Sequence, residues 1–504
     1  MIQDHALRDP HGLALTDGTR SRTWAELADR ATRAARLFGS LGLGDGDHAA
    51  LLMDNRVEAV ELVHAAFQAG IWLTPVNRHL TPDEVAYVLA DSNAKVLIAD
   101  DAHAPLARGS AVPTQLRVGD ELERALAEAS DEPLPLDGPA GGTMLYTSGT
   151  TGHPKGVKRR RPKSLRAALA GHEAYGRSIA LDGRGPHVVT GPLYHAAPLM
   201  FALYDQQNGA PMIVMPRWDE RDFLRLVAEH GAPHTHLVPT MFVRLLRLPD
   251  AERAAFDPAP LRTVLHGAAP IAPAVKQRMI EWWGPVLLEY WGGSEGGVTT
   301  LVDSREWLAH PGTVGRAVAH YEVFAVDAKG ERLPAGDEGR LFSRHRTETG
   351  FFEYHAAEAK TGGAYLPSDP NAFTLGDVGR VDADGFVYLA DRESNMIISG
   401  GVNVYPQEVE RVLAEHPAVA DVGVFGIPDD EWGERVKAAV ELAPGFAPGP
   451  ALEAEILAFA RERLASYKVP RSVDFEASLP RTPAGKLYVR RLKDRYWQGR
   501  ARRI

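Results

Sequence analysis

Short apolar runs alternate with amphipathic helical patterns in the first hundred residues, and this alternation limits the possible folds most strongly. Thr23 and Glu26 form a T-x-x-E capping box ahead of apolar positions that repeat at helical spacing as far as Phe38. Residues 49–53 and 72–76 are apolar runs of strand length. Because parallel strands are joined by helical crossovers, this order predicts an α/β fold with a largely parallel sheet between layers of helices.

Later parts of the chain follow different patterns. The α/β alternation continues as far as His266, whereas residues 314–381 are β-like, with Gly and Asp at the turns. Beyond them, a helix, two strands and another helix make an α+β unit of about 110 residues, a usual domain size. We therefore expect an N-terminal domain, residues 1–393, of mainly parallel sheets flanked by helices plus a β-rich part. A small α+β C-terminal domain, residues 394–504, should follow.

Composition excludes several classes of function. The chain has 504 residues, too many for one hydrophobic core, and its net charge of −10 argues against nucleic acid as the main partner. It contains no cysteine, which removes disulfides and thiolate chemistry and is typical of a reducing compartment. We find no signal-peptide pattern at the N-terminus and no apolar run of roughly 18 residues. We expect a cytoplasmic protein without a membrane span.

One stretch, MLYTSGTTGHPKGVK at residues 144–158, carries the strongest chemical signal. It begins like a buried strand and continues into hydroxyl side chains, glycines and a lysine, which together suit a polyphosphate. It is not a Walker A loop, because Pro154 precedes Lys155 and no Ser or Thr follows the lysine. An ordinary surface loop is the alternative. The candidate phosphate-binding residues are Thr147, Ser148, Gly149, Thr150, Thr151, Gly152 and Lys155.

TSGTTGHPKG resembles the phosphate-binding signature of the adenylate-forming superfamily, which includes acyl-CoA synthetases. Further motifs of that family follow in order: YWGGSEGG, LGDVGR, ADRESNMIISGGVNVYPQEVE and PRTPAGK, between residues 290 and 486. The resemblance spans nearly the whole chain. It implies that ATP and a carboxylic acid form an acyl-adenylate and pyrophosphate, and that a thiol then displaces AMP. The implied cofactors are ATP, Mg²⁺ and coenzyme A.

The resemblance also implies roles for residues of the N-terminal domain. Glu295 matches the Mg²⁺ ligand, Trp291 the aromatic residue that stacks on adenine, and Asp377 the carboxylate that binds the ribose. His195 matches a histidine that gates the acyl pocket. The other positions that match nucleotide contacts are Gly267, Ala268, Ala269, Gly292, Ser294 and Arg392.

In the family the C-terminal domain is a mobile lid. Lys486 matches the lysine that reaches the α-phosphate and the reacting carboxylate. Ser399, Gly400 and Gly401 match the segment that lines the coenzyme A channel. Two departures from the family pattern concern Leu375, where threonine is common, and the hinge position Ser394, where Lys or Asp is common.

Several alternatives stay open. Residues 292–296 fit G-x-S-x-G, the nucleophile elbow of α/β hydrolases, although the strand-like sequence after it does not suit that motif. The acceptor is coenzyme A or a separate carrier protein, and a homodimer is left open. A homologue without turnover is a further alternative, against which Glu295 and Lys486 speak. The pocket segments lack charge, which predicts an apolar acid, bulky or long before short.

The basic residues from Lys158 to Lys163 are typical of a solvated surface, and contact with phosphate groups of ATP or coenzyme A is the alternative. His234 and His236 alternate in an apolar segment and are expected to be strand residues, because no third metal ligand accompanies them.

Overall fold

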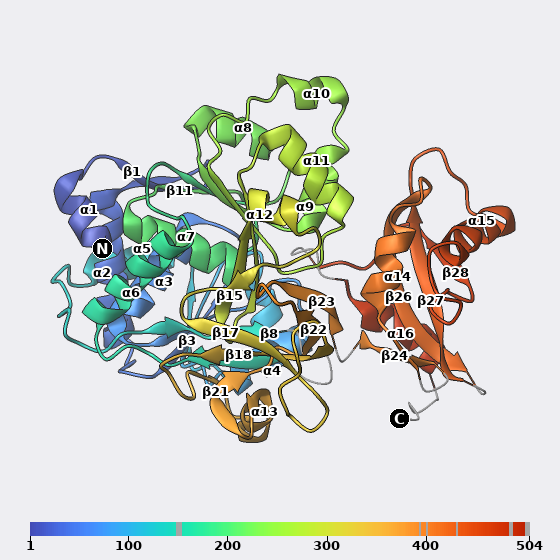
Figure 1. The fold of residues 1–504 in the computed structure, drawn as a ribbon. Coiled ribbons are helices and arrows are strands. Elements are labelled where there is room, and N and C mark those ends of the chain that lie inside the picture. The colour runs from blue at the N-terminus through green and yellow to red at the C-terminus, as the bar shows by residue number, and fades with distance from the viewer. Residues whose placement is uncertain (148–153, 393–394, 400–401, 430–431, 483–486, 499–504) are drawn as a thin grey trace.

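A computed structural model of the chain describes all residues except 148–153, 393–394, 400–401, 430–431, 483–486 and 499–504. Within the described residues the strands form five sheets, with helices packed around them (Figure 1). The predicted α/β class is confirmed, as are the parallel sheets, the β-rich part and the small α+β unit that ends the chain.

The largest sheet has nine strands and is parallel through its centre. Its order is β16-β15-β14-β13-β12-β10-β11-β1-β2, and its edge strands β15, β16 and β2 pair antiparallel. The bounds are β1 Leu13–Thr16, β2 Ser21–Thr23, β10 His187–Val189, β11 Met212–Val214, β12 His234–Leu237, β13 Thr263–His266, β14 Leu287–Gly293, β15 Gly297–Asp303 and β16 Arg316–Ala317.

A second sheet is parallel throughout, in the order β6-β5-β3-β4-β7. Its strands are β3 His48–Leu52, β4 Trp72–Pro75, β5 Val96–Ala99, β6 Thr114–Arg117 and β7 Gly142–Thr143. The helices around the two parallel sheets are α1 Ile2–Arg8, α2 Trp24–Ser40, α3 Val57–Ala69, α4 Pro82–Asp91, α5 Asp120–Glu128, α6 Leu165–Ser178, α7 Ala196–Asn208, α8 Glu220–His230, α9 Pro239–Leu246, α10 Asp250–Ala255, α11 Pro273–Trp283 and α12 Ser304–Ala309, with a 3-10 turn η1 at Ala104–Ala107.

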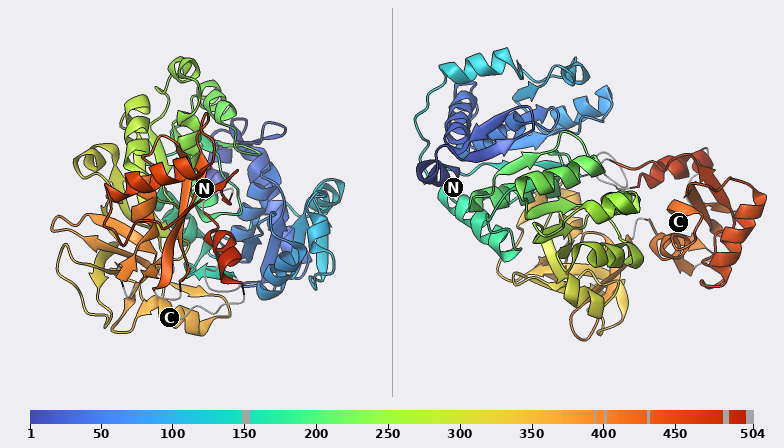
Figure 2. Two further views of the ribbon diagram at one scale, coloured as in Figure 1. Left: turned by 90° about the vertical axis from the view of Figure 1, so that its right-hand side faces the viewer. Right: turned by 90° about the horizontal axis from the view of Figure 1, so that it is seen from above.

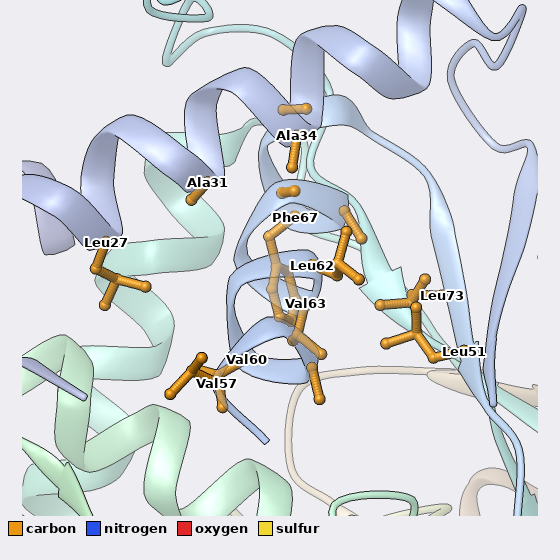
Figure 3. Packing of buried hydrophobic residues seen from close by; sticks show 14 of the residues in the cluster. Leu27, Ala31, Ala34, Leu51, Val57, Val60, Leu62, Val63, Phe67 and Leu73 are labelled. Atoms are coloured by element: carbon orange, nitrogen blue, oxygen red, sulfur yellow. The ribbon is translucent and has the colours of Figure 1, made fainter. Parts of the chain in front are cut away.

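The predicted start of α2 is confirmed. The Thr23 side chain accepts a hydrogen bond from the Glu26 backbone N–H, and the Glu26 carboxylate accepts one from the Thr23 N–H. α2 then presents Leu27, Ala31 and Ala34 to α3, which lies between α2 and the strands of the second sheet (Figure 3). Each fully buried leucine or phenylalanine in such a layer contributes about 1.5–3 kcal/mol to stability.

Two antiparallel sheets complete the N-terminal part. A three-stranded sheet, in the order β19-β9-β8, contains β8 Leu145–Thr147, β9 Lys155–Arg159 and β19 Phe352–Tyr354. A six-stranded sheet contains β17 Tyr321–Val326, β18 Glu338–His345, β20 Tyr365–Leu366, β21 Asp369–Phe373, β22 Asp377–Val381 and β23 Val387–Arg392. The short helix α13, Glu358–Ala364, interrupts the region that we expected to be β-like.

The last sheet lies at one end of the molecule, apart from the others (Figures 1 and 2). It consists of β24 Ile397–Ser399, β25 Val402–Val404, β26 Val419–Asp429, β27 Gly433–Leu442 and β28 Val473–Glu476. It packs with α14 Pro406–Leu413, α15 Pro450–Arg461 and α16 Val489–Trp497. Its core cluster draws only on residues between Ile397 and Phe475.

Hydrogen bonds link described residues of this end to the rest of the chain. The Arg247 guanidinium, after α9, donates to the Ala420 carbonyl on β26 at 2.9 Å. Near the expected boundary, the Gln407 N–H donates to the Asp391 carboxylate at 2.8 Å. In the part of the chain that the structure describes, no helix is both long enough and apolar enough to cross a bilayer.

Candidate active site

Several predicted residues lie at one edge of the nine-stranded sheet, where the carboxyl ends of neighbouring strands meet. β10, β12, β13 and β14 are parallel neighbours there, so the segments that follow them emerge side by side. His195 follows β10, Gly267 follows β13, and Trp291 lies near the end of β14. This edge is where ligands bind in open α/β sheets.

Backbone shape explains the sequence Gly267-Ala268-Ala269 after β13. A Cβ on Gly267 would lie 2.6 Å from the Tyr290 carbonyl oxygen and 2.8 Å from the Tyr290 ring, so only glycine fits. Ala268 adopts a left-handed conformation with φ of 64°, which is strained for a residue with a side chain. The chain therefore turns sharply and lies flat against β14.

Ser294 and Glu295 occupy the turn between β14 and β15. The two strands pair antiparallel, and Gly292 has no room for a Cβ because the Gly297 carbonyl oxygen would be 1.8 Å away. A nucleophile elbow requires a helix after the serine, whereas β15 follows here. The α/β-hydrolase alternative is therefore excluded by local structure.

The Glu295 carboxylate is buried and fixed in place. It is 9% exposed, and its Oε1 accepts a hydrogen bond of 2.8 Å from the Tyr354 hydroxyl. One carboxylate oriented in this way, together with phosphate oxygens, is a suitable ligand set for Mg²⁺. The residues that would hold this ion thus fit it.

Trp291 and Asp377 come together from different sheets. The Trp291 indole N–H donates to the Asp377 Oδ2 at 2.8 Å, and both side chains are buried. The Trp291 ring packs in an apolar cluster with Val323 and Leu341. Asp377 begins β22 and is paired in register with Arg392 on β23. The sequence did not predict the Trp291–Asp377 bond, and the stacking of Trp291 on adenine stays a prediction.

Lys155 is held by a carboxylate that the sequence did not identify. Its ammonium group donates to the Asp91 Oδ1 at 2.7 Å, and the hydroxyls of Tyr87 and Tyr146 donate to the same carboxylate. The hydrogen bond to Asp91 raises the pKa of Lys155, so the lysine is cationic. Thr147 on β8 lies opposite Lys155 on β9, which brings the two ends of the predicted phosphate loop together.

Lys360, on α13, is a further cation that the sequence analysis missed. Its ammonium group lies 4.2 Å from the centre of the Tyr354 ring. Burial lowers the pKa of Lys360, and the charge of Lys155 lowers it further, whereas Glu295 raises it. The charges of Lys155 and Glu295 therefore both act on Lys360. The sequence predicts that Lys155 binds phosphate and that Glu295 binds the metal ion.

The basic run from Lys158 to Lys163 is only partly solvated, so that expectation is wrong for three of its residues. Half-buried Lys158 lies with its ammonium group 5.4 Å from the centre of the Trp72 ring. Half-buried Arg159 donates from Nε to the Ser294 carbonyl at 2.9 Å. Arg161 donates to the carbonyls of Gly70 and Ala140. Arg160 and Lys163 are exposed, as predicted. The histidine expectation holds, since His234 and His236 are buried residues of β12.

The remaining predicted residues are placed as follows. His195 precedes the first residue of α7, and its ring centre lies 4.6 Å from that of Tyr194. Ser399 lies on β24 of the C-terminal sheet and pairs with Gly433 of β27. Eight predicted residues fall outside the described part of the chain: Ser148, Gly149, Thr150, Thr151, Gly152, Gly400, Gly401 and Lys486.

Comparison with known proteins agrees with the order of the motifs. Residues 2–349 match the family model of the AMP-binding enzymes, and residues 408–486 match that of the AMP-binding enzyme C-terminal domain. The long-chain-fatty-acid–CoA ligase FadD13 of Mycobacterium tuberculosis is 33% identical over 94% of this chain and 93% of its own length. The fatty acid–[acyl-carrier-protein] ligase ScoC of Streptomyces coeruleorubidus is 31% identical over 99% of this chain and 96% of its own length.

Among solved structures, the o-succinylbenzoate CoA synthetase MenE from Bacillus subtilis, in complex with its acyl-adenylate intermediate, superposes with a TM-score of 0.82. Its sequence is 27% identical, and the match covers 100% of this chain and 99% of the MenE chain. Adenylate-forming CoA ligases use ATP, Mg²⁺ and coenzyme A. On the family match and these relatives, the chain belongs to the AMP-binding, adenylate-forming enzymes.

Proposed function

We propose that the protein is an AMP-forming acyl-CoA ligase that activates an apolar carboxylic acid, bulky or long in preference to short. The acid would first react with ATP to give an acyl-adenylate and pyrophosphate. The thiol of coenzyme A would then displace AMP and give the thioester.

The observation that carries this proposal is the position of Tyr354. Its hydroxyl bonds Glu295, and its strand β19 pairs with β9, which begins at Lys155. The predicted metal-binding carboxylate is thus bonded to the small sheet that also carries the predicted phosphate-binding lysine. The first half-reaction joins two anions, so it needs positive charge held in a fixed arrangement.

We assign the other roles from the family resemblance and the geometry together. Thr147 and the loop after it, with Lys155, would bind the β- and γ-phosphates. Asp377, oriented by the Trp291 indole, would accept hydrogen bonds from the ribose hydroxyls. Lys486 would neutralise charge at the α-phosphate, and Ser399, Gly400 and Gly401 would line the coenzyme A channel after the C-terminal domain, residues 394–504, has moved.

The acyl group would lie beside the start of α7. Ala196 and Ala197 are small there, and the rings of Phe201 and Tyr290, with centres 5.1 Å apart, supply an apolar wall. FadD13, ScoC and MenE are named for fatty acids and for succinylbenzoate, which are acids with large apolar parts. The cytoplasmic location and a homodimer remain predictions.

Pyrophosphate release with a panel of acids tests the function. We expect ATP-dependent release with long-chain or aryl acids, and thioester formation when coenzyme A is present. ScoC, whose name gives a carrier protein as acceptor, supports the alternative that this chain loads a separate carrier protein instead of coenzyme A. Thioester on a phosphopantetheinyl carrier, but not on coenzyme A, would favour that alternative. Release confined to amino acids, or none that depends on ATP, would contradict the proposal.

Lys486→Ala separates the two half-reactions. Loss of a charge contact of this kind raises a barrier by roughly 3–4 kcal/mol. Adenylate formation should therefore fall by a factor on the order of 10²–10³, while conversion of a supplied acyl-adenylate to thioester stays close to the wild-type rate. An equal loss in both steps would refute the assigned role. Lys493→Ala, on α16 in the same domain, is the matched control.

A further inference from the structure

We infer that Arg159 determines which acids the site accepts, by binding an anionic or hydrogen-bond-accepting group at the end of the acid remote from the activated carboxylate. This inference rests on the proposed function and narrows its substrate class. The acid would have an apolar body and a second acceptor group, as a dicarboxylic or a carboxylated aryl acid does.

The guanidinium of Arg159 lies against the turn between β14 and β15. Nε donates to the Ser294 carbonyl at 2.9 Å, and Nη2 lies 3.4 Å from the Gly293 carbonyl. A Cβ on Gly297 would lie 3.1 Å from Nη2 and 3.2 Å from Nη1, so the absence of a side chain at Gly297 admits the guanidinium. Guanidinium has five N–H donors, more than these two carbonyls engage.

Tyrosine hydroxyls surround the same group. The same hypothetical Cβ on Gly297 would lie 3.1 Å from the Tyr175 hydroxyl, which accepts a hydrogen bond from the Val298 N–H. Tyr204 interacts with Arg159, and the centres of the Tyr175 and Tyr204 rings are 4.9 Å apart. Two hydroxyls with donor protons and a guanidinium therefore converge on one place, which suits a carboxylate.

The charge of Arg159 has no acidic partner in the described part of the chain: no carboxylate there forms an ion pair with it. Arg30, another half-buried arginine, does have such partners, because its guanidinium pairs with Glu61 and Glu123 at 2.8 Å. Glu295, the acidic residue that acts on the Arg159 charge, bonds Tyr354 and is assigned to Mg²⁺. A partly buried charge without a partner is costly, and a substrate anion would supply the partner.

Arg159 lies where the end of an acyl group remote from the activated carboxylate would lie, if the group extends along α7. α7 begins directly after His195, the proposed gate of the acyl pocket, and carries Phe201 and then Tyr204. From His195 to Tyr204 the helix advances about 13 Å. Phe201 contacts Tyr290 beside Gly267, whereas Tyr204 contacts Tyr175 beside Arg159. An acid that extends along this helix would have its apolar body at Phe201 and its remote end at Arg159.

The test compares acids that differ only at the remote end. The probes are decanoic and decanedioic acid, and para-methylcinnamic and para-carboxycinnamic acid, each assayed by pyrophosphate release with the full-length enzyme. A hydrogen-bonded ion pair favours its ligand by about 10- to 100-fold. We expect kcat/KM of the wild type to favour the diacid by such a factor in at least one pair.

Three substitutions of Arg159 test whether this residue causes the preference for the diacid. Arg159→Leu should abolish the preference for the diacid, because kcat/KM should fall further for the diacid than for the monoacid, and Arg159→Lys should keep part of the preference. Arg159→Gln serves if the leucine variant does not fold, as judged by its melting temperature. Arg166→Leu, at an exposed position on α6, is the matched control and should behave as the wild type.

Two results would overturn the inference. One is a wild-type preference for the monoacid in both pairs. The other is an equal loss for both members of each pair in Arg159→Leu, which would mean that Arg159 only supports the turn at Glu295. Failure of every acid with the wild-type enzyme would instead refute the proposed function, so the two failures are distinguishable.

Discussion

Tyr354 is the residue through which the predicted metal ligand is oriented. Its hydroxyl donates to Glu295 at 2.8 Å, and removal of such an outer partner usually weakens metal binding 10- to 100-fold. Tyr354→Phe should therefore raise the Mg²⁺ concentration needed for half-maximal pyrophosphate release by about tenfold. The KM for the acid should change little.

Tyr467→Phe is the control for this prediction, because Tyr467 is 42% exposed in the C-terminal domain. An unchanged Mg²⁺ requirement in Tyr354→Phe would show that Glu295 does not depend on Tyr354 or does not bind the metal.

Sequence reasoning found the residues with family motifs and missed their partners. Glu295, Lys155 and Asp377 belong to recognisable stretches, whereas Tyr354 and Asp91 act on two of them through hydrogen bonds between distant segments. Trp291 was predicted, but its bond to Asp377 was not. Asp91, for example, lies 64 residues before Lys155. Such pairings depend on how sheets pack, and no local pattern encodes them. Arg159 was missed for a second reason: it lies in a basic run of ordinary surface composition.

At the scale of single elements, helix α14 contains a pH-sensitive group. Burial raises the pKa of Glu410 to about 8, although the Val424 N–H donates to it at 2.8 Å and opposes that shift. The unfolded chain has the ordinary carboxyl pKa of about 4.3. The folded state therefore favours the neutral carboxyl. The contribution of Glu410 to the free energy of unfolding is fully present below about pH 4.3 and is lost as the pH rises to 8.

Glu410→Gln should remove this dependence. We expect the free energy of opening of β26 in the wild type to fall by about 2–4 kcal/mol between about pH 5 and about pH 9, and the variant to show a much smaller fall. Hydrogen exchange of the β26 amides measures it directly. An equal fall in the free energy of opening with pH in the wild type and in Glu410→Gln would contradict the assignment of the raised pKa to Glu410. Glu455→Gln, at an exposed position on α15, is the control.

Helices and strands with strong local signals were predicted well. The capping box at Thr23 marks the start of α2, and the strand after Gly296 is β15. The order of strands within the sheets was not predicted, because register and neighbours are set by non-local packing. α13 was missed since its sequence, EAKTGGA, contains two glycines and little apolar periodicity.

At the scale of the whole molecule, the C-terminal domain should be dispensable for nucleotide binding but not for chemistry. Among the described residues, its core cluster has no member from the N-terminal part, so we expect residues 1–393 to fold alone. ATP should bind this fragment with a Kd within about threefold of the full chain. Adenylate formation should fall on the order of a thousandfold, because Lys486 is lost.

Calorimetric titration measures the Kd for ATP, and a pyrophosphate-release assay measures the rate of adenylate formation. Full-length Lys486→Ala should show a similar deficit in adenylate formation. A fragment that forms adenylate at the full rate would place the catalytic lysine in the N-terminal domain.

The turn between β14 and β15 is held by side chains from four other elements. Arg159, Tyr175, Tyr321 and Tyr354 come from β9, α6, β17 and β19, and each bonds the turn backbone or Glu295. The Arg159–Ser294 and Tyr175–Val298 bonds close chain separations of 135 and 123 residues. Contacts over such distances form late in folding. During refolding, recovery of catalysis should consequently lag behind recovery of helical structure, since the metal ligand is positioned only after three sheets have docked.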